Sequence, residues 1–222
     1  SGKTLTSFLS VLNELVDSSI KGALPKDIIC VYISPLKALN NDIEVNLLRP
    51  LKEMEELHGS SLGIKVAVRT GDTTTNERTK MLKNPPHILI TTPESLAILL
   101  SSDKFKNHLS NVQWCIIDEI HALAENKRGV HLSLSLERLQ SLSQGMMRIG
   151  LSATVAPLED IAGFLAGSER KCNLVDVSYL KVSDFQVLTP TKNLAVAEHA
   201  LLNKGMYDLM HDLISSHKTT LI

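Results

Sequence analysis

The chain has 222 residues, of which 43% are hydrophobic and 21% charged, and its formal net charge is −1. These values are typical of an ordinary globular protein that holds one α/β domain, or one domain plus part of another. They exclude binding of nucleic acid through the field of the whole surface, and no apolar run approaches the roughly 18 residues that span a membrane.

The first third of the chain alternates helical and strand patterns. The predicted elements are a helix over 5–16, a strand over 28–33, a helix over 34–57 and a strand over 64–68. The first strand is a continuous β-branched run, which is typical of a strand buried on both faces. Pro50 must kink or divide the second helix, because proline lacks the N–H that a helix interior needs.

The middle of the chain continues the alternation. We predict helices over 76–82, 92–100, 132–142 and 157–165, and strands over 87–91, 114–118 and 149–151. Residues 132–142 first alternate as a strand would, but their length and the closing Gly145 favour a helix. β-Branched strands that alternate with helices predict an α/β fold with a parallel sheet covered by helices on both faces.

The pattern changes near residue 171. A last strand is expected over 173–177, then a connector over 178–203 and an amphipathic helix over 206–214. We therefore expect a first domain over residues 1–170, a terminal strand and connector over 171–205, and the start of a second domain over 206–222. Both ends look cut, because the chain enters its first helix at once and closes on the beginning of an apolar run.

The three cysteines, Cys30, Cys115 and Cys172, lie far apart without CxxC spacing. Two of them lie inside apolar runs and are interpreted as small core residues, not as a disulfide or zinc site. This usage is typical of a reducing compartment, so we expect a cytoplasmic protein.

Two adjacent carboxylates, Asp118 and Glu119, follow directly after the apolar run Trp114–Ile117. Burying two carboxylates is costly unless a cation or strong donors face them. The pair is explained if Asp118 faces a magnesium ion and Glu119 accepts a proton from an attacking water. The alternative is that the pair simply ends a strand and caps the next helix.

Ser1-Gly2-Lys3-Thr4 has the sequence that ends a phosphate-binding loop, although only four of that motif's eight positions are present. Backbone N–H groups of Ser1 and Gly2 at a helix start would bind phosphate oxygens. Lys3 would reach the β- and γ-phosphates, and the Thr4 hydroxyl would ligate magnesium. Gly-Lys-Thr alone also arises by chance, but together with Asp118 it predicts a site for ATP and Mg²⁺.

Several short motifs follow one another in the order seen in helicases. Asp118-Glu119-Ile120-His121 matches the DExH box of superfamily 2 helicases, and the longer run to Leu139 resembles the Lhr group (large helicase-related proteins). Ser152-Ala153-Thr154 resembles motif III, and the segments at Ser34-Pro35, Thr70-Gly71-Asp72 and Thr91-Thr92-Pro93-Glu94 resemble strand-contacting motifs. The resemblance implies a RecA-like P-loop NTPase domain, a second RecA-like domain that begins at 206–222, and an ATP-powered 3′-to-5′ translocase.

The resemblance also implies roles for individual residues. Lys3, Asp118 and Glu119 would act in catalysis, while His121, Ser152 and Thr154 would connect the nucleotide site to a nucleic-acid groove. Single-stranded or partly duplex DNA, RNA or a DNA–RNA hybrid would be held, without reading of its bases, by residues that follow strand ends: Pro35, Lys37, Thr70, Gly71, Thr92 and Pro93. Thr-Pro pairs also simply begin helices, and a histidine at a helix start can be merely structural.

Two other functions stay open at this point. One is a nucleic-acid-binding scaffold of helicase descent without ATPase activity, and the other is a different P-loop NTPase such as a metabolite kinase. Intact Lys3, Asp118 and Glu119 argue against the scaffold, and the helicase-like motifs argue against the kinase. We assign neither Arg128 nor Arg148 as an arginine finger. Since the ATP-facing arginines of a second domain are missing, we expect residues 1–222 alone to hydrolyse ATP slowly or not at all.

Overall fold

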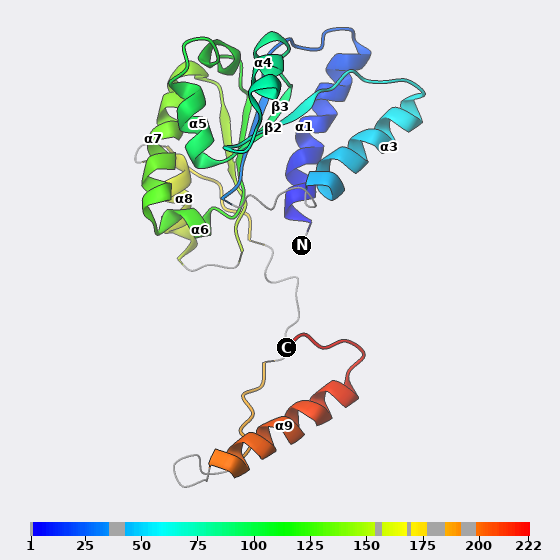
Figure 1. Cartoon of the computed structure of the whole chain (residues 1–222), viewed down its shortest axis with the longest axis vertical. Helices are drawn as coiled ribbons and strands as arrows, with labels where there is room; N and C mark the ends of the chain where they lie inside the picture. The colour runs from blue at the N-terminus through cyan, green and yellow to red at the C-terminus, as the bar shows by residue number, and fades with distance from the viewer. Residues whose placement is uncertain (1, 36–42, 154–156, 168–169, 177–184, 192–198) are drawn as a thin grey trace. The chain divides into compact units, whose positions relative to one another are not determined.

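The computed structural model describes residues 2–35, 43–153, 157–167, 170–176, 185–191 and 199–222 (Figure 1). Its contacts divide the chain into two units, Ser1–Val175 and Asp176–Ile222, which are described separately. The first unit contains the sheet and all but one of the described helices.

Five short strands form one fully parallel sheet in the first unit. Their spatial order is β2 (Val66–Arg69), β3 (Ile88–Thr91), β1 (Cys30–Ile33), β4 (Trp114–Ile117) and β5 (Met147–Gly150). The three central strands are almost wholly buried, which explains their continuous apolar sequences. β1 pairs Ile33 with Thr91 on one side and with Ile117 on the other, so the central strands end level with one another.

Helices cover both faces of this sheet, as the sequence predicts (Figure 1). One face, onto which Cys30 and Tyr32 point, packs against α1 (Lys3–Ile20), the π-helix η1 (Glu44–Leu48) and α3 (Arg49–His58). The other face packs against α4 (Thr75–Lys83), α5 (Pro93–Leu100), the 3-10 helix η2 (Lys106–Leu109), α6 (His121–Ala124), α7 (Lys127–Leu142) and α8 (Leu158–Ala166).

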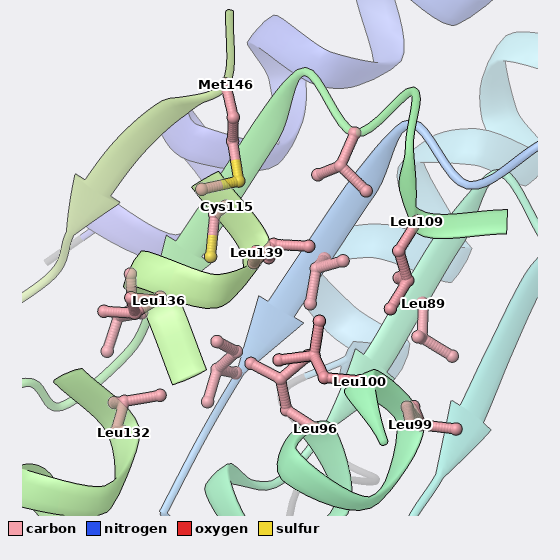
Figure 2. Close-up of a cluster of buried hydrophobic side chains, with 14 of the residues drawn as sticks. Leu89, Leu96, Leu99, Leu100, Leu109, Cys115, Leu132, Leu136, Leu139 and Met146 are labelled. Atoms are coloured by element: carbon pink, nitrogen blue, oxygen red, sulfur yellow. The ribbon is translucent and has the colours of Figure 1, made fainter. Parts of the chain in front are cut away.

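The second of these faces is built mainly from leucines. Figure 2 shows Leu96, Leu99 and Leu100 of α5 and Leu132, Leu136 and Leu139 of α7, together with Leu89 and Cys115 of the sheet. Each fully buried leucine contributes roughly 2 kcal/mol of hydrophobic free energy. The cysteines of the strands are core residues, as expected, and burial raises the pKa of the Cys115 thiol to about 12.

Several element boundaries differ from the predictions. The helix predicted over 34–57 is described from residue 43 onward, where it is divided into η1 and α3, with Pro50 in the first turn of α3. A proline is tolerated there because the first turn needs no N–H donor. α7 begins at Lys127, earlier than predicted, because the Asn126 side chain caps it by accepting the N–H groups of Arg128 (2.9 Å) and Gly129 (3.2 Å).

The strand predicted over 173–177 is wrong for the described residues 173–176, which form no regular structure. The Leu174 and Val175 side chains are 45% and 84% exposed, so this apolar run has no buried face to pack against. In the second unit, α9 (His199–Ser216) begins earlier than the predicted residue 206. Among the described helices, none has the length and apolar character required to cross a bilayer.

Candidate active site

One edge of the sheet collects most of the residues singled out by the sequence. The strands are parallel and in register, so the residues that follow them leave the sheet at the same edge. Those residues are Thr70 after β2, Thr92 after β3, Ser34 after β1, Asp118 after β4 and Leu151 after β5. Open α/β sheets bind their ligands at this edge.

The start of α1 leaves its first backbone N–H groups without an acceptor inside the helix, as any helix N-terminus does. Gly2 precedes the helix with a φ of 75°, a left-handed conformation that glycine adopts without strain, and its carbonyl accepts the N–H of Thr6 at 2.9 Å. The side chain of Lys3 leaves this end, and its Nζ donates to the backbone carbonyl of Ser152. Ser1 lies outside the described residues, whereas Thr4 lies on the first turn of α1.

Asp118 is held in place by three hydrogen bonds. Its backbone N–H donates to the carbonyl of Ile33 at 2.8 Å, and its Oδ1 accepts the backbone N–H of Glu119 at 2.9 Å. Its Oδ2 accepts the hydroxyl of Tyr32. Tyr32 is fully buried, and its ring centroid lies 4.8 Å from that of Phe8 in α1. Because Phe8 and Thr4 are four residues apart, they share a face of α1, and this stack ties that face to Asp118.

Sequence reasoning missed Tyr32. The available signal was a phenol within a strand expected to be buried on both faces, because a buried tyrosine hydroxyl usually requires a hydrogen-bond partner. The sequence does not say which partner that is, since 86 residues separate the two groups.

Glu119 occupies a strained position at the end of β4. Its φ of 48° is the only positive value of a non-glycine residue in the described part of the chain. The left-handed conformation costs such a residue roughly 1–2 kcal/mol. The turn leaves the carboxylate about half exposed, with its Oε2 3.2 Å from Nε2 of His121. Strain of this kind collects at functional sites, because packing elsewhere in the fold compensates for it.

His121 joins Glu119 to the segment that follows β5. Its Nδ1 accepts the backbone N–H of Ala153 at 3.3 Å and lies 3.3 Å from the hydroxyl of Ser152. The other ring nitrogen, Nε2, faces the Glu119 carboxylate. Lys3, Ser152, His121 and Glu119 therefore form one continuous series of contacts. Thr154 lies outside the described residues.

The residues predicted to hold a nucleic acid lie along the same edge, but several are engaged within the protein. The Thr92 hydroxyl accepts the N–H of Ser95 at 3.4 Å and caps α5, and Thr92 is only 6% exposed. The backbone N–H of Thr70 donates to the hydroxyl of Thr73 at 2.9 Å. The carbonyl of Gly71 accepts Nη2 of Arg78 at 3.0 Å. Pro93 begins α5 and is buried.

Pro35, which follows β1, is hydrogen-bonded to α7. The carbonyl of Pro35 accepts Nη2 of Arg128 at 3.0 Å. Lys37 lies outside the described residues.

Two arginines near the site have internal partners. The Arg148 side chain is 6% exposed and lies 2.9 Å from the carboxylate of Glu137, and its NH groups donate to the carbonyls of Leu136 and Leu165. Hydrogen bonds from Arg170 and then Arg148 lower the pKa of Glu137 to about 2. Arg128 pairs with Glu94 at 2.6 Å. Both arginines are thus engaged by partners within the protein.

Comparisons with known proteins give a consistent result. The family model described as DEAD/DEAH box helicase matches residues 1–161. An ATP-dependent helicase Lhr-Core of Methanothermobacter thermautotrophicus is 56% identical over 229 aligned residues, which cover 100% of this chain and 27% of that protein. An Lhr helicase/probable uracil glycosylase of Mycolicibacterium smegmatis is 40% identical and is covered to 15% of its length.

Solved structures agree with these relatives. The structure of Mycobacterium smegmatis helicase Lhr bound to ssDNA and AMP-PNP matches 99% of this chain and 28% of that chain, with a TM-score of 0.69 and 40% identity. The DEAD-box helicase Mss116 bound to ssRNA and UDP-BeF has a TM-score of 0.60 at 20% identity, a likeness of fold alone. These matches confirm the predicted RecA-like fold, and the chain spans about a quarter of the length of its first curated relatives.

Proposed function

Because this chain belongs to the DEAD/DEAH box helicase family, with Lhr helicases among its relatives, we propose that it is the ATP-binding domain of a nucleic-acid motor. The motor couples ATP hydrolysis to movement along single-stranded DNA or RNA, in the cytoplasm. The relatives' names, ATP-dependent helicase and helicase Lhr bound to ssDNA and AMP-PNP, support this assignment.

The observation that carries the proposal is the series of contacts from Lys3 through Ser152 and His121 to Glu119. A phosphate-binding lysine and a carboxylate able to accept a proton must act on the same γ-phosphate and water. Residues that lie far apart in the sequence meet here through single side-chain contacts. The fold thus supports a shared nucleotide site in place of two unrelated motifs.

The residues present fit a magnesium–nucleotide complex. Each carboxylate oxygen of Asp118 accepts one hydrogen bond, which leaves one lone pair on each for a metal-bound water. Thr4 adds a hydroxyl at the helix start. The described residues contain no cluster of three or more acidic, histidine or cysteine side chains that could hold a metal by itself. When bound, Mg²⁺ supplies positive charge that offsets the charge of the transferring phosphoryl group.

The protein's own groups divide the remaining work. Backbone N–H groups at Gly2 bind phosphate oxygens, and Lys3 exchanges a neutral carbonyl for the more strongly attracting phosphates. Glu119 accepts the proton of the attacking water, and the contact with His121 Nε2 at 3.2 Å holds its carboxylate in place. Because His121 also contacts the Ser152 segment, a change at Glu119 moves a neighbouring loop, and Thr154 is assigned to the same loop.

The segments at Pro35, Thr70-Gly71 and Thr92-Pro93, with Lys37, are assigned to the phosphates of a single strand. Backbone groups and helix starts there bind the strand without reading its sequence. Residues 206–222 are assigned to the start of a second RecA-like domain of the same protein.

The test is Glu119→Gln in the full-length parent protein, assayed for ATPase with and without single-stranded DNA or RNA. We expect turnover to fall by about a hundredfold to ten-thousandfold, the range for a lost general base, while binding of a non-hydrolysable ATP analogue is retained. Glu125→Gln is the control, because Glu125 is an exposed carboxylate on the same segment.

Two outcomes would overturn the proposal. Equal turnover in Glu119→Gln and the unmodified protein would favour a nucleic-acid-binding scaffold. An active parent that neither DNA nor RNA stimulates would favour a different class of NTPase.

A further inference from the structure

The short turn between α6 and α7 is unusually tight. A Cβ on Gly129 would lie 2.0 Å from the carbonyl oxygen of Leu123 and 3.3 Å from the ring of Phe164, so only glycine allows this approach. The Asn126 cap fixes the backbone of the first turn of α7 at the same place. Arg128 therefore projects from a rigid corner that is one short helix away from His121.

From this corner Arg128 contacts two of the segments assigned to the nucleic acid. Its Nε lies 2.6 Å from Oε1 of Glu94, and its Nη2 lies 3.4 Å from Oε2 of the same carboxylate and 3.0 Å from the carbonyl of Pro35. Glu94 directly follows Thr92-Pro93 at the start of α5. The hydrogen bond from Arg128 also lowers the pKa of Glu94.

We infer that Arg128 is a positioning residue. It links the α6–α7 corner, which follows the Asp118-Glu119 turn, to the two segments assigned to nucleic acid, at Pro35 and at the start of α5. This inference rests on the proposed function, and it adds a second connection to the one through His121 and Ser152. A planar guanidinium can hold a carboxylate and a carbonyl at fixed angles, which a lysine cannot do. Because both side chains are about half exposed, their ion pair contributes little to stability. Its role is to fix the positions of the segments that it joins.

The link predicts how binding responds to the nucleotide. A shift of α6 caused by events at Glu119 moves the α7 corner, and Arg128 transmits that shift to Pro35 and to the start of α5. Without the link, these two segments respond less to the nucleotide.

The experiment uses the full-length parent protein with Arg128→Gln, Glu94→Gln and the double variant. Affinity for single-stranded DNA is measured with and without AMP-PNP at several salt concentrations, together with ATPase activity. We expect both single variants to reduce the AMP-PNP-dependent change in DNA affinity by about threefold to thirtyfold, the range of couplings along such connections. The double variant should be no worse than either single variant, because both changes break the same link.

Two further readouts and two further variants separate positioning from other roles. Basal ATPase without nucleic acid and the KM for ATP should stay unchanged, and Lys127→Gln, which removes a neighbouring charge, should behave as the unmodified protein. Arg128→Lys should rescue only partly, because it keeps the charge but not the planar fork.

Three results would overturn the inference. The first is a loss of affinity in Arg128→Gln alone, with a salt slope reduced by about one, which would mean that Arg128 touches a phosphate directly. The second is an unchanged response in both single variants, which would leave a surface ion pair without a role. The third is a parent whose ATPase no nucleic acid stimulates, which would refute the proposed function itself. The first two results would overturn the role of Arg128 but would leave the proposed function intact.

Discussion

At the scale of single residues, the site depends on buried polar groups whose hydrogen bonds offset the cost of burying them. Tyr32 satisfies its buried hydroxyl on Asp118, and Asp118 in turn fixes the N–H of Glu119, which begins the strained turn. Neither interaction stabilises the fold strongly, because a typical hydrogen bond contributes about 1 kcal/mol net. Their effect is to fix the directions in which two carboxylates point.

Tyr32→Phe tests this arrangement in the parent protein. The ring still packs on Phe8, but Asp118 loses a donor, so the Mg²⁺ concentration needed for half-maximal nucleotide binding should rise about tenfold, as for other groups that orient metal ligands. Binding of a fluorescent ATP analogue across a magnesium titration measures it. Tyr207→Phe, on the exposed face of α9, is the matched control, and an unchanged magnesium dependence in Tyr32→Phe would refute the role.

At the scale of elements, helix packing fixes the positions of the helix ends that carry the functional side chains. α7 lies directly against α6 at Gly129, and α5 and α7 share a layer of leucines over the sheet. This layer is close-packed, so the ends of α5 and α7 keep a fixed separation. The Arg128–Glu94 contact spans that separation.

Gly129→Ala and Gly163→Ala form a matched pair within this packing. The first places a Cβ 2.0 Å from backbone and should destabilise the protein by about 2–3 kcal/mol, as overpacking does. The second meets nothing within 4 Å in α8 and should stabilise by about 0.5–1 kcal/mol, because alanine favours helix interiors. Chemical denaturation of both variants measures the difference. A neutral Gly129→Ala would show that the α6–α7 turn shifts at little cost.

The sequence predicted the strands and most helices, because continuous apolar runs leave few alternatives. It also singled out Lys3 from its motif, Asp118 from the cost of burying a carboxylate and His121 from a family resemblance. The structure brings these three to one edge of the sheet, and their roles stay predictions. It could not predict the Tyr32–Asp118 or Arg128–Glu94 contacts, which depend on the order of strands in space. For the described residues 173–176 the expected strand was wrong, because periodicity does not reveal whether an edge offers a partner.

At the scale of the whole molecule, the chain matches only part of the length of its relatives. The chain covers 27% of its Lhr-Core relative from Methanothermobacter thermautotrophicus. In motors of this class the transition state also needs a cation from elsewhere, and the described Arg128 and Arg148 are both held in internal ion pairs.

Residues 1–222 alone should therefore bind nucleotide but turn it over at least about a thousandfold more slowly than the parent, since a missing arginine finger costs that much. Parallel ATPase assays on the two purified proteins, with single-stranded DNA present, measure the ratio. Comparable rates would mean that this chain carries every catalytic group that it needs.

The central position of β1 also shapes how the protein is made. β1 leaves the ribosome before β3 and β4, its two neighbours in the sheet, have been synthesised. Until residue 91 has emerged, both edges of this apolar strand lack their partners, and until residue 117 has emerged the edge toward β4 still does, a known hazard for aggregation. The helices α1, η1 and α3, which cover one face of β1, emerge before β3, whereas α5 and α7, which cover the other face, emerge after it, so that second face stays exposed longer.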